Sequence, residues 1–475
     1  MKIANISIII FFSSYLFSQG LSSISGFVRD DTSGEPISYA NVFLSNSTLG
    51  AATNQDGYFV ISNISVGKYE LNATMIGYGI FKKNIELSEG QPIRLDIRLN
   101  EEIIQTTEVL VTAERQKFER SMESSQISLD IREINSAPAF IEPDVFRTLQ
   151  MLPGVQTTSD FSSALYVRGS TPDQNLIMLD GIAVYNPYHL GGIFSTFNTD
   201  AIKEADFHAG GFPARYGGRM GAILNVLNRE GNTRKVKGSA NISLISSKGL
   251  IEGPLPSWGG MKGSWMISGR RTYFDTVIDA LKIPIGQRID GSDIYFQFPY
   301  YFYDYQVKIN LDIDQDHRLT YSRFYGDDIV DFSFEETLES SGTNVNVKSE
   351  TGFGVKWPWG NHTNGLTWRW IIAPDLVAKT FFSHSRYRFD FELSAQDRNT
   401  YTYTDSTIEL FSDVTFRAFD IIKDNTIETA LIWQAAQDHT VTGGFQVKDV
   451  NFDLGLDISI ATQDTSIDFS LLSLV

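Results

Sequence analysis

Residues 166–184 read YVRGSTPDQNLIMLDGIAV, and the organisation of the chain follows from this stretch. Two apolar, strand-forming runs lie at 165–167 and 176–179. They are separated by Gly, Ser, Pro and Asp, residue types that form turns, and Asp180-Gly181 turns the chain a second time. The stretch therefore predicts a compact β-turn-β unit, which on these grounds alone fits any small α/β domain.

The motifs in and after this unit narrow the assignment. Arg-Gly-Ser at 168–170 is followed by Leu-Asp-Gly-Ile at 179–182 and by DFHAGGFPARYGG at 206–218. This order resembles the plug domain of TonB-dependent outer-membrane receptors, with the first two motifs at its centre and the third closing it. The motif residues implied by the resemblance are Arg168, Gly169, Ser170, Asp180, Gly181, Gly210, Gly211, Arg215, Tyr216 and Gly217.

A short helix is predicted at 143–152, ahead of this unit. Pro143 fits the first turn, Asp144 suits the positive end of the helix dipole, and four apolar residues fall on one face. Pro153-Gly154 ends the helix. In the resemblance such a helix leads through Leu-Pro-Gly-Val into the Arg-Gly-Ser turn, so we predict a plug domain over 117–232.

Length and composition limit the number of domains, the cysteine chemistry and the class of partner. A chain of 475 residues is long for one domain and indicates two to four of them. Cysteine is absent, which excludes disulfides and thiolate metal sites without placing the protein in the cytosol. The net charge of −18 argues against a nucleic-acid partner, whose phosphates would repel the chain.

The first residues indicate export. Lys2 precedes an apolar run over 6–17, which is followed by small or polar residues at 18–20. This run is shorter than the roughly 20 residues that a transmembrane helix needs, so we predict a Sec signal peptide at 1–19. A transmembrane barrel stays compatible with the rest of the chain, because its strands present apolar residues only at alternate positions.

Short strands at regular spacing predict a small antiparallel β-sandwich over 22–99. The order of Gly26-x-Val28, Ala40-Asn41-Val42, TNQDGYF at 53–59 and GKYEL at 67–71 resembles the carboxypeptidase-regulatory-like, transthyretin-like domain. Asp56-Gly57 predicts a tight hairpin turn rather than a Ca²⁺ loop, because the further spaced acids of such a loop are missing.

A linker at 100–116 contains TTEVLVTA at 106–113, a β-forming segment in polar surroundings. Such a segment can add as a strand to another protein, or it can be a first plug strand with no outside partner. Its position just before the plug resembles that of the TonB box. The residues implied to bind TonB are Glu108, Val109, Leu110, Val111, Thr112 and Ala113.

The chain from 236 to 475 is rich in Tyr, Phe, Trp and Arg and alternates in polarity. In YQVKINLDID at 305–314, apolar and polar side chains alternate over ten residues, as in a membrane strand with aromatic residues at its start. Loops are expected at 281–298 and 327–350. The fold class predicted is mainly β, with a small antiparallel β-sandwich, an α/β plug, and a partial, open antiparallel transmembrane β-barrel.

The barrel is expected to be partial because receptors of this type close about 22 strands around the plug. The residues after 235 suffice for roughly 8 to 10 strands. A closed barrel of about eight strands is the alternative, but its lumen could not hold a plug. We therefore expect an incomplete chain and an open, curved sheet around the plug.

No enzymatic constellation is found. The sequence has no His-Glu-x-x-His, Gly-x-Ser-x-Gly or phosphate-loop motif, and we expect no cofactor and no metal site. His189 and His208 could contact a ligand or an iron chelate, but lone histidines are more often hydrogen-bonded structural residues. The sandwich carries no peptidase activity without a zinc site.

The function expected from these resemblances is TonB-dependent uptake of a scarce solute such as a siderophore, oligosaccharide or peptide. The implied partners are TonB with its inner-membrane energising complex, outer-membrane lipid, and a surface lipoprotein. The protein would lie in the outer membrane with its N-terminal domain in the periplasm. The alternatives are a surface or periplasmic adhesion protein without transport, and a signalling receptor that controls a sigma factor.

Overall fold

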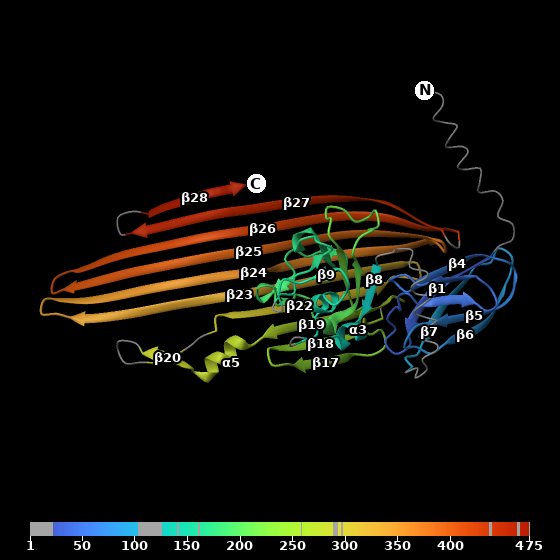
Figure 1. Ribbon diagram of the computed structural model, residues 1–475, viewed down its shortest axis with the longest axis horizontal. Helices are drawn as coiled ribbons and strands as arrows, with labels where there is room; N and C mark the ends of the chain where they lie inside the picture. The colour runs from blue at the N-terminus through green and yellow to red at the C-terminus, as the bar shows by residue number, and fades with distance from the viewer. Residues whose placement is uncertain are drawn as a thin grey trace, which may run out of the picture.

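The computed structural model describes residues 22–102, 126–139, 142–159, 162–257, 259–287, 293–295, 298–436, 439–462 and 466–474. The predicted signal peptide and the TonB-box-like segment 108–113 lie outside these ranges. Figure 1 shows a small N-terminal β domain beside one end of a long sheet, with the plug region against the same end of that sheet.

The N-terminal domain is a sandwich of two sheets. One sheet has the order β4-β1-β7 and the other β3-β2-β5-β6. Their bounds are β1 Ser22–Asp30, β2 Asn41–Leu44, β3 Gly50–Ala52, β4 Tyr58–Ile64, β5 Gly67–Thr74, β6 Phe81–Leu87 and β7 Ile93–Leu99. Alternate apolar side chains, Leu71 and Ala73 among them, form the buried core between the sheets. The predicted sandwich is confirmed, although β1 and β7 pair in parallel.

The turn at Asn54–Gly57 differs from the predicted hairpin. It is tight, because Gly57 N donates to Asn54 O at 2.9 Å and Gly57 has φ +72°. The turn joins β3 of one sheet to β4 of the other, so the hairpin was wrong. The Asn54 side chain accepts from Tyr58 N at 2.9 Å, and this bond fixes the crossing between the sheets.

The plug is built on a five-stranded sheet of order β12-β11-β16-β15-β8. The strands are β8 Gln126–Asp130, β11 Leu176–Leu179, β12 Ile182–Ala183, β15 Ile202–His208 and β16 Ile223–Asn228. Smaller elements connect them: α3 Ile131–Ser136, α4 Val145–Leu149, β9 Val155–Gln156, β10 Tyr166–Val167, β13 Tyr188–His189 and β14 Phe194–Ser195. The 3₁₀ turns are η2 Pro172–Gln174, η3 Leu190–Gly192 and η4 Thr199–Ala201.

Helix α4 is the predicted helix, with shorter bounds. Asp144 is its N-cap and accepts from Phe146 N at 2.8 Å and Arg147 N at 3.1 Å. Pro143 therefore precedes the cap instead of lying in the first turn. The other oxygen of Asp144 accepts from Ser195 N at 2.7 Å, so the cap also holds β14.

The large sheet has ten strands among the described residues, each antiparallel to the next, in the order β17-β18-β19-β22-β23-β24-β25-β26-β27-β28. Their bounds are β17 Lys237–Ile242, β18 Ser246–Pro254, β19 Lys262–Thr272, β22 Tyr300–Asp312, β23 His317–Ser341, β24 Val345–Ala373, β25 Leu376–Tyr403, β26 Thr407–Ala436, β27 His439–Thr462 and β28 Ser466–Leu474. Strands β17 and β28 are its edges, so the sheet is open, as expected (Figure 1).

One predicted loop is wrong and the other is largely confirmed. Residues 327–350 continue β23 and β24, which turn only between Ser341 and Val345. The described residues between 281 and 298 stay outside the large sheet and carry the short pair β20 Pro284–Gln287 and β21 Asp293–Tyr295, after helix α5 Phe274–Leu281. No helix in the described parts of the chain is long and apolar enough to cross a membrane.

The large sheet has two unlike faces because side chains alternate along each strand. The inner face meets the plug with buried residues such as Gln306, Asn361 and Ser385. On the outer face, apolar side chains that are 37% to 62% exposed form what we call the outer apolar band. It comprises Leu366, Trp368, Trp370 and Ile372 of β24, Phe382 of β25, Ile427, Leu431 and Trp433 of β26, and Val441, Phe445 and Val447 of β27.

Candidate functional site: the seat of the plug in the sheet

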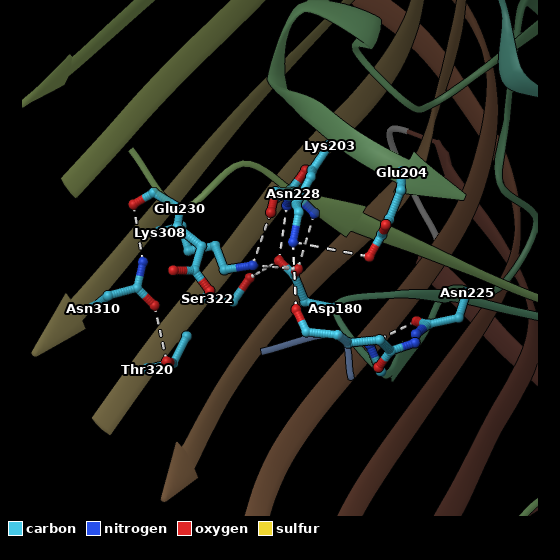
Figure 2. Close-up of polar contacts among 12 residues, drawn as sticks. Asp180, Lys203, Glu204, Asn225, Asn228, Glu230, Lys308, Asn310, Thr320 and Ser322 are labelled. Atoms are coloured by element: carbon cyan, nitrogen blue, oxygen red, sulfur yellow. Dashed lines mark hydrogen bonds and ion pairs between the residues drawn. The ribbon is translucent and has the colours of Figure 1, made fainter. Parts of the chain in front are cut away.

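Asp180 lies where the plug meets the inner face of the large sheet (Figure 2). It follows β11 and has a left-handed backbone with φ +51°. One oxygen accepts from Lys308 Nζ at 2.8 Å and from Asn228 N at 3.0 Å. The other accepts from Ser322 Oγ at 2.5 Å and Asn228 Nδ2 at 2.9 Å. We call Asp180, Asn228, Lys308 and Ser322 the plug seat.

The plug seat is an ion pair closed off from solvent. The side chains of Asp180 and Lys308 are 7% and 8% exposed. Burial raises the pKa of the Asp180 carboxyl. Lys308 and the hydrogen bond from Ser322 lower it by more than burial raises it, so the net pKa lies below its usual value. The carboxylate is therefore charged at neutral pH, and its partners come from two different strands of the large sheet.

Hydrogen bonds along the segment after β16 extend the seat. Lys308 Nζ also donates to Asn228 O at 2.9 Å. Glu230 pairs with Arg318 Nη2 at 2.5 Å, and Glu230 O accepts from Asn310 Nδ2 at 2.9 Å. Asn310 in turn accepts from Thr320 Oγ1 at 2.9 Å (Figure 2). Strands β22 and β23 therefore hold both side chains and backbone of the plug.

His189 forms a second buried anchor. Its Nδ1 lies 2.6 Å from Asp328 and its Nε2 lies 3.5 Å from Asp304, which also pairs with Arg270 at 2.7 Å. The ring stacks on Phe302 with the centroids 4.0 Å apart. Burial lowers the pKa of His189. The two carboxylates raise it by more than burial lowers it, so the net pKa lies above its usual value. The two carboxylates therefore favour the protonated form of the imidazole, which links the plug to β22 and β23.

Further bonds reach strands on both sides of the seat. Tyr185 Oη donates to Asp424 at 2.8 Å, and Ser385 Oγ donates to Ala183 O at 2.6 Å. On the opposite side, Lys248 Nζ lies 2.7 Å from the Glu142 carboxylate. The plug is thus fixed to strands from β18 to β26.

The structure separates the predicted motif residues into two groups. Asp180 and Gly181 belong to the seat, where Gly181 has φ +81° and its N donates to Asn225 Oδ1 at 3.0 Å. Arg168 and Gly210 meet elsewhere in the plug, since a side chain on Gly210 would lie 2.9 Å from Arg168 Nη1.

The remaining motif residues lie around this second group. Gly169 has φ +85° and Gly211 φ +65°, and Ser170 Oγ donates to Val167 O at 2.7 Å. Arg215 is half exposed, lies 3.5 Å from Glu428 of β26, and packs 5.0 Å above the ring of Tyr216. A side chain on Gly217 would meet no atom within 4 Å. His208, at the end of β15, is buried with its ring 6.0 Å from that of Tyr216.

The sequence prediction missed the sheet half of the site. Lys308 and Ser322 lie on the polar side of alternating strands and were recognised only as part of a pattern. The charge of Lys308 was the available signal. A charged residue that points into a barrel lumen filled by a plug is buried, and a buried charge requires a partner.

The N-terminal domain also contacts the plug and the large sheet. Glu35 Oε1 accepts from Glu230 N at 2.8 Å and Gly231 N at 3.0 Å, directly after the seat. Asp56 pairs with Lys379 of β25 at 2.6 Å. An apolar cluster of Phe27, Tyr58, Ile371 and Val377 lies beside this pair.

Two family matches agree with this architecture. Residues 24–111 match the CarboxypepD_reg-like domain and residues 130–223 match the TonB-dependent receptor plug domain. The chain therefore carries a CarboxypepD_reg-like domain followed by a TonB-dependent receptor plug domain, which confirms both resemblances. No curated protein matches the chain.

Solved structures give weaker likenesses. A mutant ferric enterobactin receptor from Pseudomonas aeruginosa is 12% identical with a TM-score of 0.32, covering 72% of this chain and 60% of its own. The outer membrane transporter YddB from Escherichia coli is 8% identical with a TM-score of 0.31, covering 71% of this chain and 74% of its own. A cohesin–X-dockerin complex from Acetivibrio cellulolyticus is 22% identical over 16% of this chain and 56% of that chain, with a TM-score of 0.14. The assignment rests on the two family matches.

Proposed function

We propose that this chain acts in the outer membrane as a receptor that takes up a scarce solute with energy supplied through TonB. The observation that carries the proposal is the plug seat, where a plug domain is ion-paired to the inner face of an open sheet. A domain held in this way blocks the space inside the sheet and must shift before a solute can pass.

The outer apolar band supports the membrane location. Phe382, Ile427 and Val447 are 45% to 61% exposed, and they lie opposite one another on the neighbouring strands β25, β26 and β27. An apolar outer face with aromatic residues along one border is typical of a sheet that spans a bilayer. A water-soluble protein would rarely expose so continuous an apolar surface.

The position of β8 supports a mechanical role for the TonB-box-like segment. Strand β8 is the edge of the plug sheet and begins at Gln126, after the segment at 108–113. Tension applied at Gln126 would reach its pairing partner His208 first. The ladder between β8 and β15 would then break one residue at a time, which needs less force than breaking all its bonds together.

The test is deletion of Glu108–Ala113. We expect solute binding at the cell surface to persist, while capture of the periplasmic domain of TonB and solute uptake are both lost. Deletion of Arg115–Arg120 removes the same number of residues from the stretch between this segment and β8, and serves as the matched control. Uptake that survives loss of 108–113 would exclude the TonB mechanism, and adhesion without TonB capture would favour a surface-binding protein. Mass spectrometry of small molecules that co-purify with the protein would identify the solute.

A further inference from the structure

The outer face of the large sheet changes from apolar to charged along a sharp line. The last apolar row crosses four strands as Leu366, Phe382, Ile427 and Val447, which lie directly opposite one another in register. The next row, which lies closer to the turn between β23 and β24, is polar on every strand from β23 to β27. It comprises Arg323, Asn364, His384, Asn425 and Asp449.

The second polar row is cationic at its centre. It runs Tyr325, His362, Arg386, Lys423 and Asn451, again in direct register. The direction of these side chains follows from their neighbours: Ser385 and Tyr387 are buried against the plug, so Arg386 between them points outward.

Arg386 and Lys423 are an unbalanced pair. They lie directly opposite each other on β25 and β26, where like charges destabilise a sheet. Among the described residues, neither side chain forms an ion pair or a hydrogen bond, whereas nearby Arg388 is paired with Asp327 at 3.0 Å. Two adjacent cations that pair with no acid among the described residues, in a chain of net charge −18, are suited to an anion that bridges them.

We propose that Arg386 and Lys423, flanked by His362 and His384, bind the phosphate groups of an acylated lipid in the outer leaflet. This inference rests on the proposed function, because it takes the outer apolar band as the membrane-spanning surface. The lipid's acyl chains would cover Phe382 and Ile427, while its phosphates meet the cations directly beyond them. A soluble phosphate would gain only the second contact, so we commit to the lipid.

The test compares lipid capture by the purified full chain in neutral detergent. The probe is fluorescently labelled diphosphoryl lipid A, and the reference is the same lipid without its phosphates. For Arg386→Gln combined with Lys423→Gln we expect about 30-fold weaker capture of the phosphorylated probe, which corresponds to about 2 kcal/mol for two charges at a lipid surface. Capture of the dephosphorylated lipid should not change.

Controls separate charge at this site from charge in general. Lys348→Gln with Arg398→Gln removes two cations from the same face, where they are paired with Glu350 and Glu409, and should leave capture unchanged. Arg386→Lys with Lys423→Arg should retain binding. If the double Gln variant does not fold, Lys423→Gln alone should weaken capture about fivefold.

The outcomes distinguish this inference from the proposed function. Equal capture by wild type and the Gln variant, or equal capture of both lipids, would overturn the lipid site. Capture of the TonB domain by the same preparation would show in that case that the proposed function stands. A wild-type chain that does not insert into vesicles would overturn both.

Discussion

At the scale of single residues, the ion pair of Asp180 with Lys308 decides how firmly the plug is seated. Asp180→Asn keeps the shape of the side chain but leaves Lys308 buried at 8% exposure without a counter-charge. Removing one partner of a buried pair costs about 3 to 5 kcal/mol. We expect the plug to open more often, measured as faster hydrogen exchange in β11 and β16.

Asp173→Asn is the matched control for this substitution. Asp173 lies in the turn η2 of the same domain and is exposed, so the same chemical change should leave exchange in β11 and β16 unaltered. Slow exchange in Asp180→Asn, equal to wild type, would show that the plug seat contributes little.

The second anchor, His189, gives the attachment of the plug a pH dependence. Its pKa in the folded protein is raised above the usual value, since the carboxylates of Asp328 and Asp304 outweigh burial. A group with a raised pKa stabilises the fold fully below its unfolded pKa of about 6.5, and this contribution is lost as pH rises through the folded pKa. As pH rises above about 6.5, thermal stability of the wild type should therefore fall more than that of His189→Gln. Parallel curves for the two proteins would contradict the bridging role.

At the scale of elements, a helix or strand could be predicted where the residues that determine it lie close together in the sequence. The position of α4 was available because its cap, Asp144, is adjacent in sequence to the apolar face it precedes. The sandwich strands and the open sheet followed from alternation and from length. The turn at Asn54–Gly57 was recognised, but its crossing between two sheets was not, because sheet membership is set by partners far along the chain.

The long strands show the limit of the alternation pattern. Strand β24 has 29 residues, although strands of about ten were expected. Phe332 and Phe334 alternate with Asp331 and Ser333 in the segment that was taken as a loop, and the alternation continues into β24. The segment was expected to be a loop, but the same alternation of apolar and polar side chains extends β23 to Ser341.

At the scale of the whole molecule, the contacts between domains lay beyond sequence reasoning. The pair of Asp56 with Lys379 joins residues more than 300 positions apart, and either residue alone reads as an ordinary surface charge. The same holds for Glu35, which accepts from the backbone of Glu230 and Gly231. Such contacts depend on how finished domains fit together, which no local pattern encodes.

The Asp56 contact predicts that the N-terminal domain is held to the end of the large sheet by charge. Burial raises the pKa of Asp56. Lys379 and Arg369 lower it by more than burial raises it, so the carboxylate is charged at neutral pH. Asp56→Lys would face Lys379 with a like charge and should release the domain. Faster hydrogen exchange around Phe27 and Tyr58, whose rings pack beside the pair, would report this release.

A second substitution makes this prediction specific. Lys379→Asp in the Asp56→Lys chain restores opposite charges at the same two positions, so slow exchange around Phe27 should return. Glu86→Lys makes the same acid-to-lysine change on the N-terminal domain, where Glu86 is 69% exposed, and should leave exchange unchanged. If Asp56→Lys behaves like Glu86→Lys, the other contacts hold the domain and the ion pair is incidental.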